Sequence, residues 1–209
     1  MLSGVLDGVA AGALGDLPEH GNLRALLAGE PAIVTRITDT GEPGYDVYVE
    51  REPAATLGAA LVAAGVSALD SDIADAIRIE AGMPQFGRDM DEETIPLEAG
   101  IETRAISFSK GCYVGQEVII RVLHRGHGRV ARKLVGLSLE GDAAPPAGAL
   151  VRAGDKDVGH VTSSAMSPAL ERPIALAYLH RDFLTPGTAV SVDGVSAVVA
   201  ELPFVSPLS

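Results

Sequence analysis

The chain has 209 residues, 47% of them hydrophobic and 21% charged, which is typical of a globular protein that buries a sizeable core. A single cysteine excludes a disulfide within the chain, and no apolar run approaches the length of about 18 residues that a membrane-spanning helix requires. The opening residues lack the basic flank of a secretory signal. These features predict a cytoplasmic protein that makes no membrane contact.

The first part of the chain predicts both helices and strands. The turn-forming residues Gly41-Glu42-Pro43-Gly44 separate two runs with strand character, which indicates a hairpin. Pro53 suits a helix start and Asp70-Ser71 suits an N-cap, so a helix is expected after each. The expected elements are a weak helix at 2–14, strands at 32–38 and 45–49, and helices at 53–64 and from 71 to about 82.

The pattern changes after residue 84. Residues 84–110 lack clear periodicity and predict loops, and 114–123 predict a short helix. Beyond them, short apolar runs alternate with turn residues, which is typical of a small antiparallel barrel or sandwich. The expected strands cover 133–139, 149–152, 158–162, 174–178, 189–192 and 196–202. We therefore expect an α+β domain over residues 1–129 and a C-terminal antiparallel β-barrel over 130–209.

The net charge of −12 is unevenly distributed along the chain. Residues 104–133 contain seven basic side chains and one acidic side chain, Glu117, so this segment has a net charge of +6. The basic residues are Arg104, Lys110, Arg121, Arg125, Arg129, Arg132 and Lys133. A cationic segment attracts anions even in an acidic protein. It is either a solvated basic surface or an anion-binding site, and its position around the only cysteine favours a site.

The cysteine has neighbours that suit a reactive thiol. Cys112 follows Lys110, is flanked by Gly111 and Gly115, and precedes the helix expected at 114–123. Positive charge and the free N–H groups at a helix start both favour the thiolate, which is the form that attacks electrophiles and binds metals. The alternative is a buried cysteine that acts as a small hydrophobic residue, which is the commoner fate.

Other polar clusters are weaker candidates for a site. His124 and His127 lie in a basic glycine-rich segment, where we expect loop or anion contacts. One cysteine cannot complete a tetrahedral zinc site with them. The acidic run at 89–93 lacks the spacing of a calcium loop, and we expect it to form a solvated turn.

The residues around the cysteine resemble a known family. The octapeptide Lys110-Gly111-Cys112-Tyr113-Val114-Gly115-Gln116-Glu117 is similar to the signature of YgfZ-type proteins, which resemble the glycine cleavage T-protein (an aminomethyltransferase) but serve iron–sulfur enzymes. Further segments occur in the order found in this superfamily, and they are residues 41–46, 77–84, 89–92, 95–100, 124–126 and 133–137. The octapeptide resembles the YgfZ branch, whereas the flanking segments are shared with the T-protein.

The resemblance implies a fold and a set of site residues. It implies a ferredoxin-like α+β part of the T-protein type, followed by the barrel, with a tetrahydrofolate site that the cysteine loop faces. The implied folate-binding residues are Asp46, Tyr45 and Arg121, and a carboxylate at position 46 suits the paired N–H donors of a pterin edge. Cys112 would be the working thiol and a transient iron–sulfur ligand, with Lys110 keeping it anionic. The implied motif loop further contains Gly111, Tyr113, Gly115, Gln116 and Glu117.

The resemblance also implies a function. It implies a folate-binding accessory protein for iron–sulfur cluster assembly or repair, with iron–sulfur proteins as partners and any cluster shared with them, because one thiol cannot hold a cluster alone. The first alternative is a folate-dependent aminomethyltransferase, although Asp46 replaces the usual glutamate and Ala74 replaces an arginine of the T-protein pattern. The second alternative is a tRNA-modification factor. We expect no direct nucleic-acid binding, because aromatic residues make up only 4% of the chain and no stacking platform accompanies the basic segment.

Members of this family normally carry a further folate-binding half before the region that matches Ala32. Either the sequence is a fragment, or its start codon is misplaced, or a partner chain supplies that half. We expect the chain alone to leave an apolar face uncovered and to be weakly stable or to self-associate.

Overall fold

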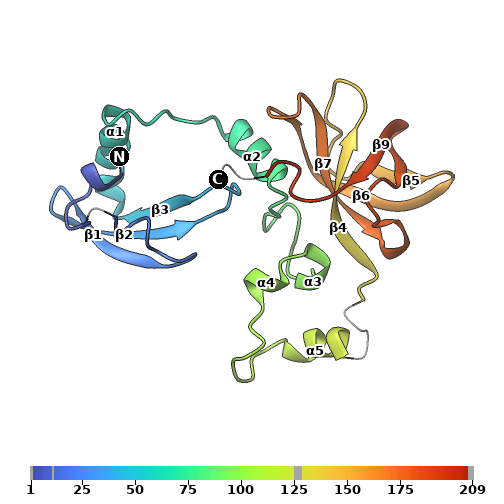
Figure 1. Cartoon of the computed structure of the whole chain (residues 1–209), viewed down its shortest axis with the longest axis horizontal. Coiled ribbons are helices and arrows are strands. Elements are labelled where there is room, and N and C mark those ends of the chain that lie inside the picture. The colour runs from blue at the N-terminus through green and yellow to red at the C-terminus, as the bar shows by residue number, and fades with distance from the viewer. Residues whose placement is uncertain (1, 11, 125–128, 207–209) are drawn as a thin grey trace. The chain divides into compact units, whose positions relative to one another are not determined.

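Two compact units make up the described part of the chain, which comprises residues 2–10, 12–124 and 129–206 of this computed structural model (Figure 1). The first unit runs to Ala74 and the second begins at Asp75. The expected α+β class and the C-terminal antiparallel barrel are both confirmed. The domain boundary expected near residue 130 stays a prediction.

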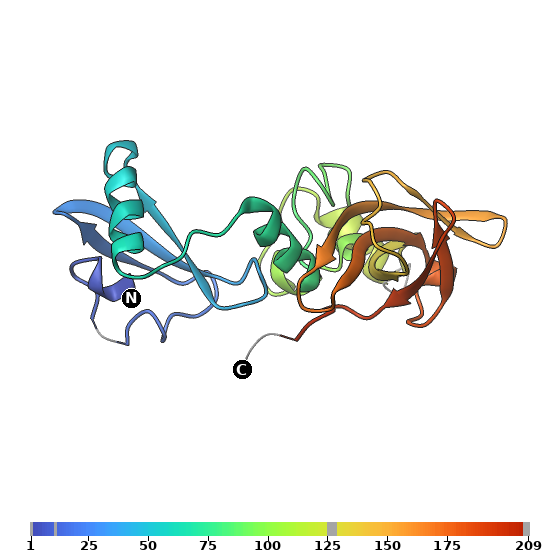
Figure 2. The ribbon, with the colours of Figure 1, turned by 90° about the horizontal axis from the view of Figure 1, so that it is seen from above.

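A three-stranded antiparallel sheet with one helix on it forms the first unit. The elements are η1 (Leu2–Gly4), β1 (Asn22–Leu27), β2 (Glu30–Ile37), β3 (Gly44–Val49) and α1 (Arg51–Ala63), with the strands in the order β1-β2-β3. Alternate side chains of the sheet face α1, and Val34 is fully buried in the same core as Leu57 of the helix. Figure 2 shows α1 lying across one face of the sheet. The opposite face carries the exposed side chains of Ile33 and Tyr48, which are cross-strand neighbours.

A closed six-stranded barrel forms most of the second unit. Before it come α2 (Ser71–Glu80), which spans the boundary between the units, α3 (Pro96–Ala99), α4 (Glu102–Ala105) and α5 (Gln116–His124). The barrel elements are β4 (Arg132–Leu139), β5 (Leu150–Ala153), β6 (Lys156–Ser167), β7 (Arg172–His180), η2 (Arg181–Phe183), β8 (Ala189–Val192) and β9 (Val195–Ala200). Around the barrel the order is β4-β7-β6-β5-β8-β9, with antiparallel pairs.

Side chains of the barrel strands alternate between two apolar cores. Val135 and Leu137 of β4 face the barrel interior and belong to its central core. Leu134 of β4 and Tyr178 of β7 lie on the outer surface, where they pack with Ile79 of α2. The outer core therefore holds the C-terminal end of α2 against the barrel wall.

The structure confirms most of the expected elements, with shifted ends. All six barrel strands, the hairpin around residue 41, and the helices near 53–64, 71–82 and 114–123 are present. The helix expected at 2–14 is wrong: of the described residues in this range, only Leu2–Gly4 are helical, and Gly8 and Gly12 adopt positive φ angles that a right-handed helix cannot contain. Strand β1 and the short helices α3 and α4 were not expected. No helix in the described residues is long and apolar enough to cross a membrane.

Candidate functional site

The cysteine loop is exposed. Cys112 has a free thiol at the surface, so the alternative of a buried cysteine is wrong. Residues 111–113 have no regular structure, and Gln116 and Glu117 form the first turn of α5. Gly115, which lies between the cysteine segment and α5, has a φ of +88°, a left-handed conformation that a side chain would strain. This glycine lets the chain turn directly from the cysteine segment into the helix.

Lys110 and Tyr113 are in contact on this loop. The Lys110 Nζ atom lies 4.8 Å from the centre of the Tyr113 ring, which is a cation–π contact. The Lys110 backbone N–H also donates a hydrogen bond to the Ser107 hydroxyl at 3.3 Å. The Lys110–Tyr113 contact thus spans Cys112, and the hydrogen bond to Ser107 precedes it. The expectation that Lys110 keeps the thiol anionic stays a prediction.

The helix after the loop exposes apolar and basic side chains together. None of its residues is buried, and Val118 and Ile120 are 50% and 42% exposed. A hollow of about 300 Å³ on this helix is lined by Glu117, Ile120, Arg121 and His124. Arg121 therefore lies beside an apolar side chain, and its expected folate contact stays a prediction. Arg125 and His127 lie outside the described residues.

The expected folate-contact residues of the first unit lie on opposite faces of β3. Tyr45 packs against the core, and its hydroxyl donates a hydrogen bond to the Leu14 carbonyl at 2.9 Å. Asp46 lies on the open face, where the Tyr48 hydroxyl donates to Asp46 Oδ2 at 3.0 Å. Of the two expected residues, only Asp46 presents a polar group on the face that carries no helix. These residues belong to the first unit and the cysteine loop to the second.

The contact between Asp46 and Tyr48 has a measurable consequence. The Asp46 carboxylate raises the pKa of the Tyr48 phenol, first through the hydrogen bond and then through its charge, and Asp39 contributes less. We expect Asp46→Asn to lower the pKa of Tyr48 towards its ordinary value, because the substitution removes the charge and weakens the acceptor. A pH titration of the Tyr48 ring signals by NMR measures this. Asp39→Asn is the control and should lower that pKa less; equal effects of the two variants would contradict the hydrogen bond.

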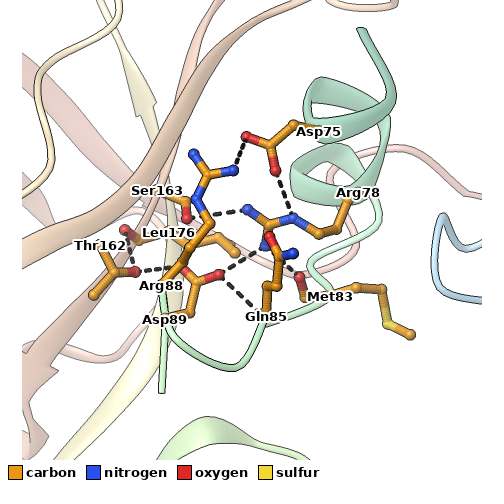
Figure 3. Close-up of polar contacts among 9 residues, drawn as sticks. All are labelled: Asp75, Arg78, Met83, Gln85, Arg88, Asp89, Thr162, Ser163 and Leu176. Atoms are coloured by element: carbon orange, nitrogen blue, oxygen red, sulfur yellow. Dashed lines mark hydrogen bonds and ion pairs between the residues drawn. The ribbon is translucent and has the colours of Figure 1, made fainter. Parts of the chain in front are cut away.

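A buried ion pair joins the segment before the barrel to the barrel wall (Figure 3). Arg78 of α2 donates from Nη1 to Asp89 Oδ2 at 2.7 Å and from Nη2 to the Ser163 hydroxyl of β6 at 3.0 Å. Asp89 also accepts hydrogen bonds from the Gln85 N–H and the Thr162 hydroxyl. The Asp89 side chain is fully buried, so the expectation of a solvated acidic turn is wrong for this residue. The pair fixes the start of the segment that leads to the cysteine loop.

A small polar hollow lies beside this ion pair. It has a volume of about 180 Å³ and is bordered by Tyr178, whose hydroxyl is buried without a hydrogen-bond partner among the described residues. Burial raises the pKa of Tyr178 to about 12. The Arg132 guanidinium lies 4.9 Å from the centre of the Tyr178 ring and pairs with Glu98 at 3.0 Å. Burial, and then the Arg132 charge, lowers the pKa of His160 at the same hollow. The Tyr178 hydroxyl is therefore a neutral donor suited to a water molecule or another small polar group.

Two family models match successive parts of the chain. Residues 14–110 match the GCVT N-terminal domain, and residues 132–206 match the glycine cleavage T-protein C-terminal barrel domain. Among similar proteins, the aminomethyltransferases of Streptomyces coelicolor and Halothermothrix orenii are 38% identical over 196 residues and 30% identical over 209 residues. These alignments cover 91% and 96% of this chain, but 52% and 57% of the relatives. The chain therefore spans about half the length of the curated relatives it matches.

A solved structure has the same fold. It is the glycine cleavage system aminomethyltransferase T from Bartonella henselae, with a TM-score of 0.80 and 24% sequence identity, covering 92% of this chain and 54% of that one. The α+β part and the closed barrel thus have the fold of a glycine cleavage aminomethyltransferase. The chain belongs to the glycine cleavage T-protein superfamily. The superfamily expected from the sequence is confirmed, whereas the YgfZ-type branch stays a proposal.

Proposed function

We propose that this chain is a YgfZ-type, folate-binding accessory protein for iron–sulfur cluster assembly or repair, with Cys112 as its working thiol. The observation that supports this most directly is the exposure of Cys112 within the octapeptide that resembles the YgfZ signature. An exposed thiol can meet the metal centre of another protein, whereas a buried thiol cannot. A role in tRNA modification would then be indirect, through iron–sulfur enzymes that methylthiolate tRNA.

A single thiol would act together with ligands from a second molecule. No group of three or more His, Cys, Asp or Glu side chains within the described ranges could hold a metal ion. Protein-bound clusters commonly take four ligands, of which Cys112 would supply one. The Cys112 thiolate would bind one iron atom while the client or a small thiol supplies the other ligands, and it would be displaced when the cluster moves on. Folate would bind at Asp46, whose carboxylate suits the N–H donors of a pterin.

Folate-dependent aminomethyl transfer is the second candidate. The names of the similar proteins support this activity more directly than they support the accessory function. Tetrahydrofolate would accept the one-carbon unit of an aminomethyl donor with release of ammonia, Asp46 would orient the pterin, and Cys112 would have no part in the reaction. This candidate rests on proteins of which the chain spans about half.

Replacing Cys112 with alanine separates the two candidates. In cells that lack the wild-type protein, we expect Cys112→Ala to support iron–sulfur-dependent methylthiolation of tRNA about tenfold less well than wild type, since the variant lacks the reacting group. The unfolding midpoint and the affinity for tetrahydrofolate should not change, because the side chain is exposed. Ser109→Ala, a similarly small truncation at an exposed position of the same segment, is the matched control.

The two outcomes point to different functions. Full methylthiolation with Cys112→Ala would refute the accessory function as proposed. Conversion of tetrahydrofolate to its methylene form by the purified protein with an S-aminomethyl thiol as donor and release of ammonia, equally fast in wild type and Cys112→Ala, would establish the second candidate. If tetrahydrofolate bound neither wild type nor Cys112→Ala, the folate-binding part of both candidate functions would be refuted.

A further inference from the structure

A basic groove opens at the end of the barrel where β4 begins and β7 ends. It has a volume of about 490 Å³, which lies within the usual range of small-molecule sites. Its lining consists of Arg129, Val130, Lys133, Arg181, Asp182 and Leu184. Three cations and one carboxylate give the groove a net charge of +2 in a chain whose total is −12. The groove shares no residue with the cysteine loop or with the Asp46 face.

Lys133 occupies an unusual position for a lysine. Lys133 lies on the same face of β4 as Val135 and Leu137, whose side chains fill the barrel interior. It is therefore the first inward-facing residue of the strand. It is half-buried and lines the groove at the mouth of the barrel. Within the described ranges, no carboxylate lies in ion-pair distance of Lys133 or Arg129. A partly desolvated cation without a partner favours an anionic ligand.

The other polar groups of the groove, around Arg181 and Asp182, already have partners within the protein. Asp182 is 3.9 Å from Arg181, so the one acid of the groove is already associated with a cation. The Arg181 backbone N–H donates to the Ala131 carbonyl at 3.0 Å and is therefore not available to a ligand. The Asp182 backbone N–H is likewise directed to His180 Nδ1 at 3.4 Å. At η2, anion recognition therefore falls to the long cationic side chains rather than to these two backbone amides.

This arrangement favours carboxylates over phosphates. Phosphate sites commonly use clustered backbone N–H groups, whereas the Arg181 and Asp182 N–H groups at this rim already have acceptors. Arginine matches a carboxylate with two parallel hydrogen bonds, and lysine adds a compact charge. Val130 and Leu184 supply apolar surface between the cations, which suits the methylene groups of a flexible organic acid. Nucleic acid is disfavoured because none of the described residues that line the groove is aromatic.

We propose that this groove binds a small molecule that carries two or more carboxylates, held by Lys133, Arg129 and Arg181. Two kinds of ligand carry at least two carboxylates in this way: the glutamate end of a folate, and a free di- or tricarboxylate. The proposal does not depend on folate binding, because a free tricarboxylate tests the groove by itself.

The test uses citrate as the first probe on the full chain. We expect citrate to shift the amide signals of Lys133 and Leu184 saturably in NMR spectra at low salt. Lys133→Gln should weaken binding about tenfold, the ratio that one charge-assisted hydrogen bond supplies, and Arg181→Gln should weaken it similarly. Lys156→Gln, which removes the same charge from an exposed position at the start of β6, should bind citrate within about twofold of wild type.

A second pair of probes distinguishes the two kinds of ligand. Tetrahydrofolate and tetrahydropteroate, which lacks the glutamate, are compared on wild type and Lys133→Gln. If Lys133→Gln weakens the binding of tetrahydrofolate but not of tetrahydropteroate, the glutamate end of folate occupies the groove. If the variant weakens the binding of citrate but of neither pterin compound, a free polycarboxylate occupies it.

Three results would overturn the proposal. The first is the absence of saturable shifts with citrate in the wild type. The second is an equal loss of citrate affinity in Lys133→Gln and Lys156→Gln, which would indicate general charge attraction. The third is tighter binding of a short single-stranded RNA or of inorganic triphosphate than of citrate at the same residues, which would assign the groove to phosphates.

Discussion

Replacing Arg78 with methionine is expected to destabilise the second unit by about 3–5 kcal/mol. The substitution leaves the fully buried Asp89 carboxylate without its cation, and an uncompensated buried charge costs far more than an intact pair contributes. Arg78 also donates to Asp75 Oδ1 at 2.8 Å and to the Met83 carbonyl at 2.6 Å, and these contacts disappear as well. Domains are commonly stable by only about 5–15 kcal/mol, so a loss of this size is large. Denaturant unfolding followed by circular dichroism measures it.

The exposed ion pair between Arg152 and Asp157 provides the matched control. Its Nε–Oδ1 distance is 2.7 Å, but the two side chains are 54% and 57% exposed, so Arg152→Met should cost at most about 1 kcal/mol. Combining Arg78→Met with Asp89→Asn should cost less than the sum of the single variants, because the second change removes the charge that the first leaves unpaired. If Arg78→Met were no more destabilising than Arg152→Met, the pair would not be buried as described.

Local sequence patterns were sufficient to predict the barrel but not the start of the chain. The barrel strands follow from short apolar runs between turns, such as Asp193 and Gly194, which both have positive φ between β8 and β9. β1 has no such signal, because Asn22–Leu27 contains residues that favour helices. It is a strand because it pairs along its whole length with β2, and this tertiary contact outweighs local propensity.

The candidate site was predictable only where its residues are close in the sequence. Cys112 and its neighbours form a continuous motif, whereas the exposure of the thiol depends on packing that no local pattern reports. Arg78 and Ser163 are 85 positions apart, so their contact could not be inferred from spacing. The contact between Tyr48 and Asp46 was predictable from the sequence, because the two residues are two positions apart and a strand places such residues on one face.

An alanine at Gly159 is expected to destabilise the barrel by about 3 kcal/mol, the upper end of the range for overpacked cores. Its Cβ would lie 1.9 Å from the Tyr178 carbonyl oxygen and 2.7 Å from Leu179 Cδ2. The nearest obstacle is backbone rather than a flexible side chain, so rotamer changes cannot relieve it. Gly159 pairs with Leu179 between β6 and β7, and the strands can separate there only by weakening their hydrogen-bonded ladder.

Gly111→Ala makes the same chemical change in the same unit without the steric conflict. A Cβ at Gly111 would meet no atom within 4 Å, and the residue lies on the exposed cysteine loop, so we expect the unfolding free energy to change by less than about 0.5 kcal/mol. Comparing the two variants by denaturant unfolding separates packing from the general effect of replacing glycine. Equal stability of both would mean that β6 and β7 lie further apart at Gly159 than the structure places them, and the barrel wall that carries Tyr178 would need a different packing.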